Sequence, residues 1–252
     1  MIKILNSFLA AIAFYTIIPI PHNAQLNFNK LPLWLPWIGF LIASLVIIIN
    51  NLLTIVSVPS LTKAGLVVAW WLYITGGLHL DGVMDSADGL AVQDAQKRLP
   101  VMRDSFTGAF GVMAGIIVIG LKVVAFSEIS AYPWLALVLA MAWGRWGQLC
   151  AIAFYPYLRI EGKGLFLKES IKLPQDLFLG STFIVVIVFM QGFFLNQPWW
   201  TILLTNICSA LISLMVGWWF YHKLKGHTGD TYGATVEWTE AFILCFLTTI
   251  NN

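Results

Sequence analysis

Long apolar runs, separated by short polar segments, dominate the chain. Seven of them are long enough to cross the hydrocarbon core of a bilayer, at 33–56, 64–80, 109–128, 132–154, 178–196, 199–221 and 236–250. Each is predicted to be a helix, because lipid offers no hydrogen-bond partners to an open backbone. A further run, 4–20, ends at Pro19 and Pro21 and is expected to form a short interfacial or re-entrant helix. The pattern predicts an all-α polytopic transmembrane bundle of about six to eight helices.

Composition indicates one integral membrane domain over residues 1–252. Of the 252 residues, 59% are hydrophobic and only 10% are charged, whereas soluble domains carry about a quarter charged residues. The lipid bilayer is therefore the first partner that we expect. The net charge of +2 is too small to indicate a nucleic acid partner. Cys150, Cys208 and Cys245 lie far apart in apolar runs, which argues against disulfide and zinc roles.

Positive charges are distributed unevenly between alternate loops. One side receives nearly all of the loop Lys and Arg residues, namely Lys30, Lys97, Arg98, Arg103, Arg159, Lys163, Lys168, Lys172, Lys223 and Lys225. The other side receives Lys63, with Lys122 near its edge. The positive-inside rule places the first set in the cytoplasm. We therefore expect a multi-pass protein of the cell inner membrane whose polar loops and active site face the cytoplasm.

The segment GGLHLDGVMDSADGLA places three carboxylates where an apolar run meets water. Asp81, Asp85 and Asp88 are spaced by four and then three residues, so a helix would present them on one face. Their mutual repulsion is unfavourable unless it is compensated, and a hard cation such as Mg²⁺ accepts carboxylate oxygens. A solvated acidic helix start is the alternative. The glycines of this segment are poor helix formers and favour the metal site.

A second acidic group lies in KGHTGDTYGATVEWTE. Asp230 and Glu237 are seven residues apart and would point the same way from one helix, with Glu240 on a neighbouring stripe. Carboxylates within a membrane are costly and indicate function by default. We predict Asp230 and Glu237 as further metal ligands. In the alternative interpretation, Glu237 and Glu240 simply pair with Lys223 or Lys225.

Two basic segments suit phosphate binding. Arg103 can hold a phosphate through two hydrogen bonds, and Asp104 beside it can add a metal ligand. A topology anchor with a local ion pair is the alternative there. In YPYLRIEGKGLF, Arg159 and Lys163 flank a glycine-rich turn, which is typical of phosphate capture by backbone amides. An ordinary cytoplasmic loop also accounts for this segment.

His79 and His227 flank the two acidic groups, and Arg145 lies inside an apparent span. An imidazole can act as a general base, a metal ligand or a structural hydrogen-bonding group. We treat His79 as a candidate for catalysis and His227 as a candidate for substrate binding. Arg145 needs a carboxylate or phosphate partner unless its side chain reaches the interface. Pairing with one of the clustered acids is the favoured interpretation.

Together these groups describe a place for a phosphorylated substrate and a divalent metal. Metal ions neutralise non-bridging phosphate oxygens, and a carboxylate such as Asp81, Asp85 or Asp88 can accept the attacking hydroxyl's proton. No Ser-His-Asp order, cysteine nucleophile or zinc signature competes with this interpretation. The residues predict metal-dependent phosphoryl or phosphodiester transfer at the cytoplasmic face of a membrane.

Four strings, GGLHLDGVMDSADGL, MRDSFTGAFGVMAG, YLRIEGKGL and GHTGDTYGA, resemble in order and spacing the cobalamin synthase family, adenosylcobinamide-GDP ribazoletransferase. The resemblance covers about residues 30–240. It implies a Mg²⁺-dependent inner-membrane enzyme with corrinoid and nucleoside substrates. In that reaction a ribose hydroxyl of α-ribazole, or of its 5′-phosphate, displaces GMP from adenosylcobinamide-GDP.

The resemblance carries Asp81, Asp85 and Asp88 over as the acidic motif, and it adds Asp104 and Asp230. It also leads us to expect one wide pocket, with acids on the aqueous side and Trp or Phe side chains on the bilayer side. A homo-oligomer, or an association with other cobalamin-pathway enzymes, stays open.

Two other functions remain as alternatives. A CDP-alcohol phosphotransferase-like enzyme also uses clustered Asp residues, and Asp85, Asp88 and Gly89 fit the start of that pattern, but the segment 90–93 lacks its Ala-Arg. An ion-coupled transporter would use the acids and Arg145 to carry protons or ions. The chain shows no evident repeat, however, and its acids cluster at one surface.

Overall fold

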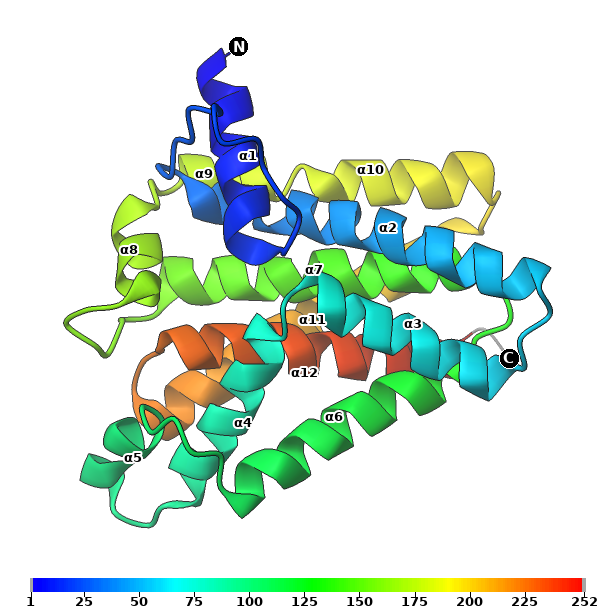
Figure 1. The fold of residues 1–252 in the computed structure, drawn as a ribbon. Helices are drawn as coiled ribbons and strands as arrows, with labels where there is room; N and C mark the ends of the chain where they lie inside the picture. Colours follow the sequence, from blue (N-terminus) through cyan, green and yellow to red (C-terminus); the bar gives the residue numbers. More distant parts are fainter. Residues whose placement is uncertain (1, 251–252) are drawn as a thin grey trace.

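The computed structural model describes residues 2–250, and every regular element in that range is a helix (Figure 1). The predicted all-α fold is confirmed. In chain order the elements are α1 (Ile2–Tyr15), η1 (Leu31–Trp34), α2 (Leu35–Ile55), α3 (Ser60–Ile74), α4 (Leu78–Ala91), α5 (Ala95–Val101), α6 (Ala109–Glu128), α7 (Pro133–Phe154), α8 (Lys163–Ser170), α9 (Gln175–Gly180), α10 (Phe183–Phe189), η2 (Met190–Phe194), α11 (Trp199–Leu224) and α12 (Gly229–Thr248).

Several helical stretches fit the thickness of a bilayer. Within the described residues, five are long and apolar enough to cross it, namely Leu31–Ile55, Ala109–Glu128, Pro133–Phe154, Gln175–Phe194 and Trp199–Leu224. Each of the five overlaps a run that the sequence predicts as a span. The prediction of a polytopic helical membrane protein is therefore confirmed at the level of length and composition.

The run predicted at 64–80 is not one straight helix. Its first part is α3, and after a short turn the chain continues as α4 at an angle of 91°. Gly76 and Gly77 form the turn with φ values of +61° and +68°, a backbone region that glycine enters without a steric penalty. The prediction of one continuous helix is wrong here, and α3 with α4 makes a broken span or a re-entrant loop.

The run predicted at 236–250 belongs to a helix that begins seven residues earlier. Thr228 starts α12 with a capping box, in which its side chain accepts from the Thr231 N–H and the Thr231 side chain accepts from the Thr228 N–H. Because α12 carries Asp230, Glu237 and Glu240, it is not among the apolar candidate spans. It packs instead against α4, α6, α7 and α11. The second acidic group of the sequence is thus carried on an interior helix.

Helix α7 forms the centre of the bundle. It runs through the middle of the molecule, with α2 on one side and α11 and α12 on the other (Figure 1). Glycines allow the backbones to approach closely: a side chain at Gly39 would collide with the Met141 carbonyl, and one at Gly147 would press on Ser213. Helix α7 therefore packs at close range against α2 and against α11.

Four charged side chains meet inside the bundle and are completely or almost completely buried. Lys122 of α6 donates to Glu237 at 2.6 Å and also to Glu240, and Arg145 of α7 donates to Glu240. The Lys122 ammonium also lies 4.1 Å from the centre of the Trp71 ring. The two cations and two carboxylates compensate one another, as buried charges require. We call these four residues the buried ion cluster.

The buried ion cluster bears on three expectations. Arg145 pairs with an acid, as predicted. Lys122, expected near the edge of the opposite side, has its side chain fully buried among the helices. The alternative that Glu237 and Glu240 pair with lysines 223 or 225 is wrong, because their partners are Lys122 and Arg145.

Candidate active site

Helices α4 and α12 cross in direct contact, and this crossing places the two acidic segments together. A side chain at Gly82 would collide with the backbone carbonyl of Asp230, and one at Gly233 would press on the backbone of His79. Only a residue without a Cβ permits so close an approach. The glycines within the two motifs therefore set the distance between the acidic face of α4 and Asp230.

Asp81 and Asp85 lie one turn apart on the outer face of α4. Asp81 is exposed and Asp85 is partly buried. Neither carboxylate has a hydrogen bond or an ion pair to any residue in the range 2–250. The acidic neighbours of Asp85 are Asp81, Asp230 and Asp88. The fold therefore brings the acids of α4 near Asp230.

Asp88 has a different local role from the other two acids of α4. Its carboxylate accepts the N–H of Gly108 at 2.7 Å and that of Gly111 at 2.8 Å. These are free N–H groups at the start of α6, where a negative charge is favourable. Asp88 thus caps α6 from a neighbouring helix, and it fills the space where side chains at Gly108 and Gly111 would lie. This explains why glycines follow Arg103 and Asp104 in the sequence.

The loop that contains Arg159 is held against the segment before α12. The Leu158 N–H donates to the His227 carbonyl, and the His227 N–H donates to the Pro156 carbonyl, both at 2.9 Å. This pairing brings the Arg159 guanidinium to 2.6 Å from the Asp230 carboxylate. Lys163 follows at the first turn of α8 and is exposed.

These elements enclose a polar pocket of about 230 Å³. We use "polar pocket" for this cavity, which lies between α1, α4, α7, α12 and the loop 155–164. Five of the predicted site residues line it, namely His79, Asp81, Arg159, Lys163 and Asp230. The structure therefore gathers groups from three motifs that are far apart in the sequence, with both signs of charge at the same cavity.

Arg103 and Asp104 lie beside this cavity but do not line it. Arg103 makes an exposed ion pair of 3.3 Å with Glu161, and Asp104 accepts the Phe106 N–H at 3.0 Å within its own turn. The link between Arg103 and Glu161 joins the segment 102–108 to the loop 155–162. The exposed guanidinium remains accessible to a bound phosphate, whereas nothing in the geometry directs Asp104 toward the other acids.

His227 and Glu237 have internal partners. The ring of His227 is buried, with one nitrogen 3.1 Å from the Gly217 carbonyl and the other 3.1 Å from the Thr231 hydroxyl. Burial lowers the pKa of His227 to about 4, so the ring is neutral near pH 7 and cannot attract a phosphate by charge. Glu237 belongs to the buried ion cluster. Neither residue lines the polar pocket.

Sequence reasoning did not identify four residues of the polar pocket, Tyr15, Gln148, Tyr157 and Tyr232. Tyr15 and Gln148 lie within apolar runs, where no spacing rule distinguishes them from core residues. Tyr232 follows Asp230 by two residues in the motif GHTGDTYGA. Its place in that motif is the one signal by which the sequence could have indicated a site residue.

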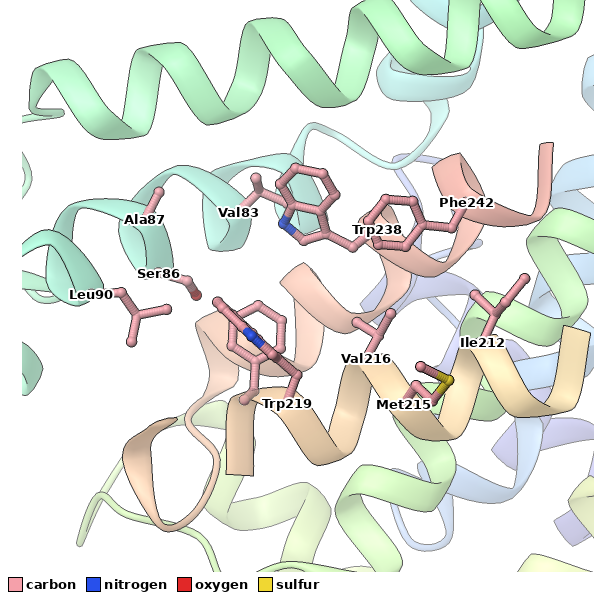
Figure 2. A pocket seen from close by; sticks show the side chains of 11 residues that line it. Val83, Ser86, Ala87, Leu90, Ile212, Met215, Val216, Trp219, Trp238 and Phe242 are labelled. Carbon is pink, nitrogen blue, oxygen red and sulfur yellow. The ribbon is translucent and has the colours of Figure 1, made fainter. Parts of the chain in front are cut away.

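A second, apolar pocket of about 540 Å³ lies on the opposite face of α4, between α4, α11 and α12 (Figure 2). Val83, Ala87 and Leu90 line it from α4, and Trp219 and Trp238 from the other two helices. Helical periodicity places these α4 positions away from the three Asp residues. The expectation of one wide pocket, acidic on one side and aromatic on the other, is wrong. The polar pocket and the apolar pocket that contains Trp219 and Trp238 are separated by the thickness of a helix.

A Gly82→Ala replacement tests the role of the close helix crossing. The new methyl group would meet the Asp230 backbone, so α4 and α12 must separate. We expect a loss of about 1–3 kcal/mol in the free energy of unfolding. We also expect a marked fall in turnover number, because the separation moves Asp230 away from the acids of α4. Gly65→Ala is the matched control, because a side chain at that helical glycine meets open space. Equal stability and equal turnover of the two variants would contradict the contact between Gly82 and the Asp230 backbone.

The comparisons with known proteins agree across the length of the chain. The family profile described as cobalamin-5-phosphate synthase matches residues 7–248. The adenosylcobinamide-GDP ribazoletransferase of Trichormus variabilis is 47% identical over 249 residues, which cover 98% of this chain and 99% of the relative. The proteins of the same name from Synechocystis sp. and Brevibacillus brevis are 48% and 33% identical, over 96% of this chain in each case and over 94% and 98% of the relatives. No solved structure shows a significant match. The chain belongs to the cobalamin-5-phosphate synthase family.

Proposed function

We propose that this protein joins α-ribazole, or its 5′-phosphate, to adenosylcobinamide-GDP and releases GMP. The observation that carries the proposal is the match to relatives of that name over nearly the whole of both chains. The polar pocket supplies the chemistry that such a transfer needs, because it brings carboxylates and cations to one place. The reaction forms a new phosphodiester bond to a ribose hydroxyl and breaks the bond between the two phosphates.

Mg²⁺ is the cofactor that the site fits best. Mg²⁺ is usually held by one or two carboxylates, with water and substrate phosphates completing its shell. Asp81 and Asp85 provide two carboxylates with no other partner in the range 2–250, whereas Asp88 and Asp230 already accept hydrogen bonds. The described residues contain no group of three or more possible ligands, which is compatible with a two-carboxylate site. A bound Mg²⁺ would neutralise charge on the phosphate oxygens during transfer.

Arg159 and Lys163 are the cations that we assign to the pyrophosphate of the GDP-linked substrate. Both line the polar pocket, Arg159 from the segment before α8 and Lys163 from the start of α8. Arg159 is held in place by its contact with Asp230, whereas the Lys163 side chain has no partner in the described part of the chain. Arg103 lies beside the polar pocket and can add a further contact to the pyrophosphate.

The corrinoid ring is too bulky for the polar pocket, so only its phosphate-bearing arm enters. We propose that the ring stays at the opening and that the site faces the cytoplasm of a multi-pass inner-membrane protein. The support for this orientation is the excess of Lys and Arg in the loops that surround the pocket. A polar GMP would then leave directly into the cytoplasm.

Replacing Lys163 with Ala is expected to raise the KM for adenosylcobinamide-GDP by about ten- to a hundredfold, because a charge-assisted contact is worth about 1.5–3 kcal/mol. Steady-state kinetics at saturating Mg²⁺ and α-ribazole measure this change. Lys172→Ala is the control, since Lys172 is also exposed but lies away from the pocket. The assignment fails if the two variants give the same KM.

The proposed function is tested by purified protein in detergent or liposomes, supplied with adenosylcobinamide-GDP, α-ribazole and Mg²⁺. We expect equal amounts of GMP and of the joined corrinoid product, detected by liquid chromatography and mass spectrometry. Accumulation of substrate inside liposomes without GMP release would instead support the transporter alternative.

A further inference from the structure

The inner end of the polar pocket is formed by four polar side chains from four different helices. Tyr15 of α1, His79 of α4, Gln148 of α7 and Tyr232 of α12 all line the cavity, and none is more than 3% exposed. We call these four residues the inner wall. The ring of Tyr15 stacks on that of His79 with centroids 6.4 Å apart, and Tyr232 stacks on His227 and lies tilted against Tyr157.

The inner wall carries an unusual concentration of unpartnered polar atoms. Both ring nitrogens of His79, the Gln148 carbonyl oxygen and the hydroxyls of Tyr15 and Tyr232 are buried without a hydrogen bond in the described structure. Buried donors and acceptors are nearly always paired, because each unpaired one loses its hydration without compensation. Five such atoms around one cavity indicate that a polar ligand completes the wall.

The chemistry of the inner wall defines the class of ligand. It contains no carboxylate, lysine or arginine, so it suits an uncharged group. Tyrosine hydroxyls both donate and accept, imidazole nitrogens form hydrogen bonds, and the glutamine oxygen accepts. Sugar hydroxyls also donate and accept, and they can satisfy all of these atoms. A volume of about 230 Å³ is below the usual range for a complete drug-sized ligand, but a ribose ring fits it.

We infer that the inner wall binds the ribose of the acceptor nucleoside. The inference rests on the proposed function, and it deepens that function by assigning the two ends of the pocket. In phosphoryl transfer the attacking and leaving oxygens lie roughly in line on opposite sides of the phosphorus atom. With the phosphates held by Arg159 and Lys163 at the open end, the GMP leaves toward solvent. The attacking ribose hydroxyl must then approach from the inner end.

His79 acquires a defined position in this arrangement. Its ring and Asp81, the first acid of the α4 motif, line the same cavity. A ribose bound at the inner wall would place its hydroxyls between the His79 ring and the Asp81 carboxylate. The acceptor ribose is thereby held beside the groups that can accept the proton of its attacking hydroxyl.

The experiment measures equilibrium binding to the full-length protein in detergent, with α-ribazole and GMP as two separate probes. Tyr15→Phe and Tyr232→Phe each remove one hydroxyl of the inner wall and keep the ring. Each is expected to weaken α-ribazole binding about three- to tenfold and to leave GMP binding unchanged. Ser209→Ala is the matched control, because it removes a buried, unpartnered hydroxyl outside the pocket. We expect no change in either affinity for this variant.

An α-ribazole analogue that lacks one ribose hydroxyl extends the test to the unmodified protein. We expect the wild type to bind it more weakly than α-ribazole, and at least one Tyr→Phe variant to bind the two compounds with equal affinity. Weaker GMP binding by the variants, with α-ribazole unaffected, would overturn the assignment and place the guanosine ribose at the inner wall. Unchanged binding of both probes would mean that the wall holds only water, which also overturns it. Because these readouts need no turnover, they are separate from the GMP-release assay of the proposed function.

Discussion

Replacing Asp85 with Asn is expected to lower turnover by roughly a hundredfold or more, because a catalytic metal ion contributes several kcal/mol of transition-state stabilisation. The side chain keeps its size but loses the negative charge that attracts Mg²⁺. Asp85 lies on α4 near Asp81 and Asp230, and its carboxylate forms no hydrogen bond or ion pair with any described residue. The loss should be largest at limiting Mg²⁺ and should shrink partly as Mg²⁺ rises.

The control for this prediction is Glu128→Gln, which removes an exposed carboxylate at the far end of α6. Initial rates across a Mg²⁺ series, with protein amounts matched by size-exclusion chromatography, compare the two variants. Wild-type activity of the Asp85→Asn protein at limiting Mg²⁺ would show that this carboxylate belongs to a structural face of the helix.

Replacing Glu240 with Ala is expected to cost about 3–5 kcal/mol of folding free energy, the usual effect of removing one partner from a buried ion pair. Glu240 accepts from both Lys122 and Arg145, so its loss leaves two buried cations with only Glu237. Thermal unfolding in detergent and the yield of folded protein measure the effect. Loss of activity should follow the loss of folded protein, because the buried ion cluster does not line the polar pocket.

A double-variant cycle separates the ionic contribution from packing. Lys122→Met alone leaves Glu237 without its cation, whereas Lys122→Met combined with Glu237→Gln leaves the pair of Arg145 and Glu240 intact. We expect the double variant to be clearly more stable than the sum of the two single effects implies. Strict additivity of the two changes would contradict the contact between Lys122 and Glu237.

Much of the fold follows from the apolar runs, because a bilayer permits few alternatives to helices of about twenty residues. The exception at 64–80 has a local cause. Gly76 and Gly77 permit a sharp turn that average hydropathy does not register. The apolar run 236–250 covers only part of α12, because Thr228 caps the helix well before that run begins.

The polar pocket could be predicted in part. Spacing placed Asp81 and Asp85 on one face of a helix, but it did not show that Gly82 packs against the Asp230 backbone. Spacing could not show that Asp88 caps α6, because its partners, Gly108 and Gly111, lie on another element. Periodicity within one helix describes which way a side chain points, but it does not show what the side chain meets.

The acids that the sequence grouped with Asp230 show the same limit. Glu237 pairs with Lys122, which lies 115 positions earlier in the chain. One sequence carries no signal for a contact at that separation, so a structural pair and a metal ligand look alike. The inner wall was missed for a related reason, since Tyr15 and Gln148 stand in apolar runs and acquire a polar role only when four helices converge.

The most direct test of the proposed active site is a structure of the protein with Mg²⁺ and a non-hydrolysable analogue of adenosylcobinamide-GDP, determined by electron cryo-microscopy in a lipid nanodisc. We expect Mg²⁺ bound by Asp81 and Asp85, the phosphates within hydrogen-bond distance of Arg159 and Lys163, and the corrinoid ring outside the polar pocket. Mg²⁺ and phosphates bound away from the junction of α4 and α12, with the polar pocket unoccupied, would contradict the account.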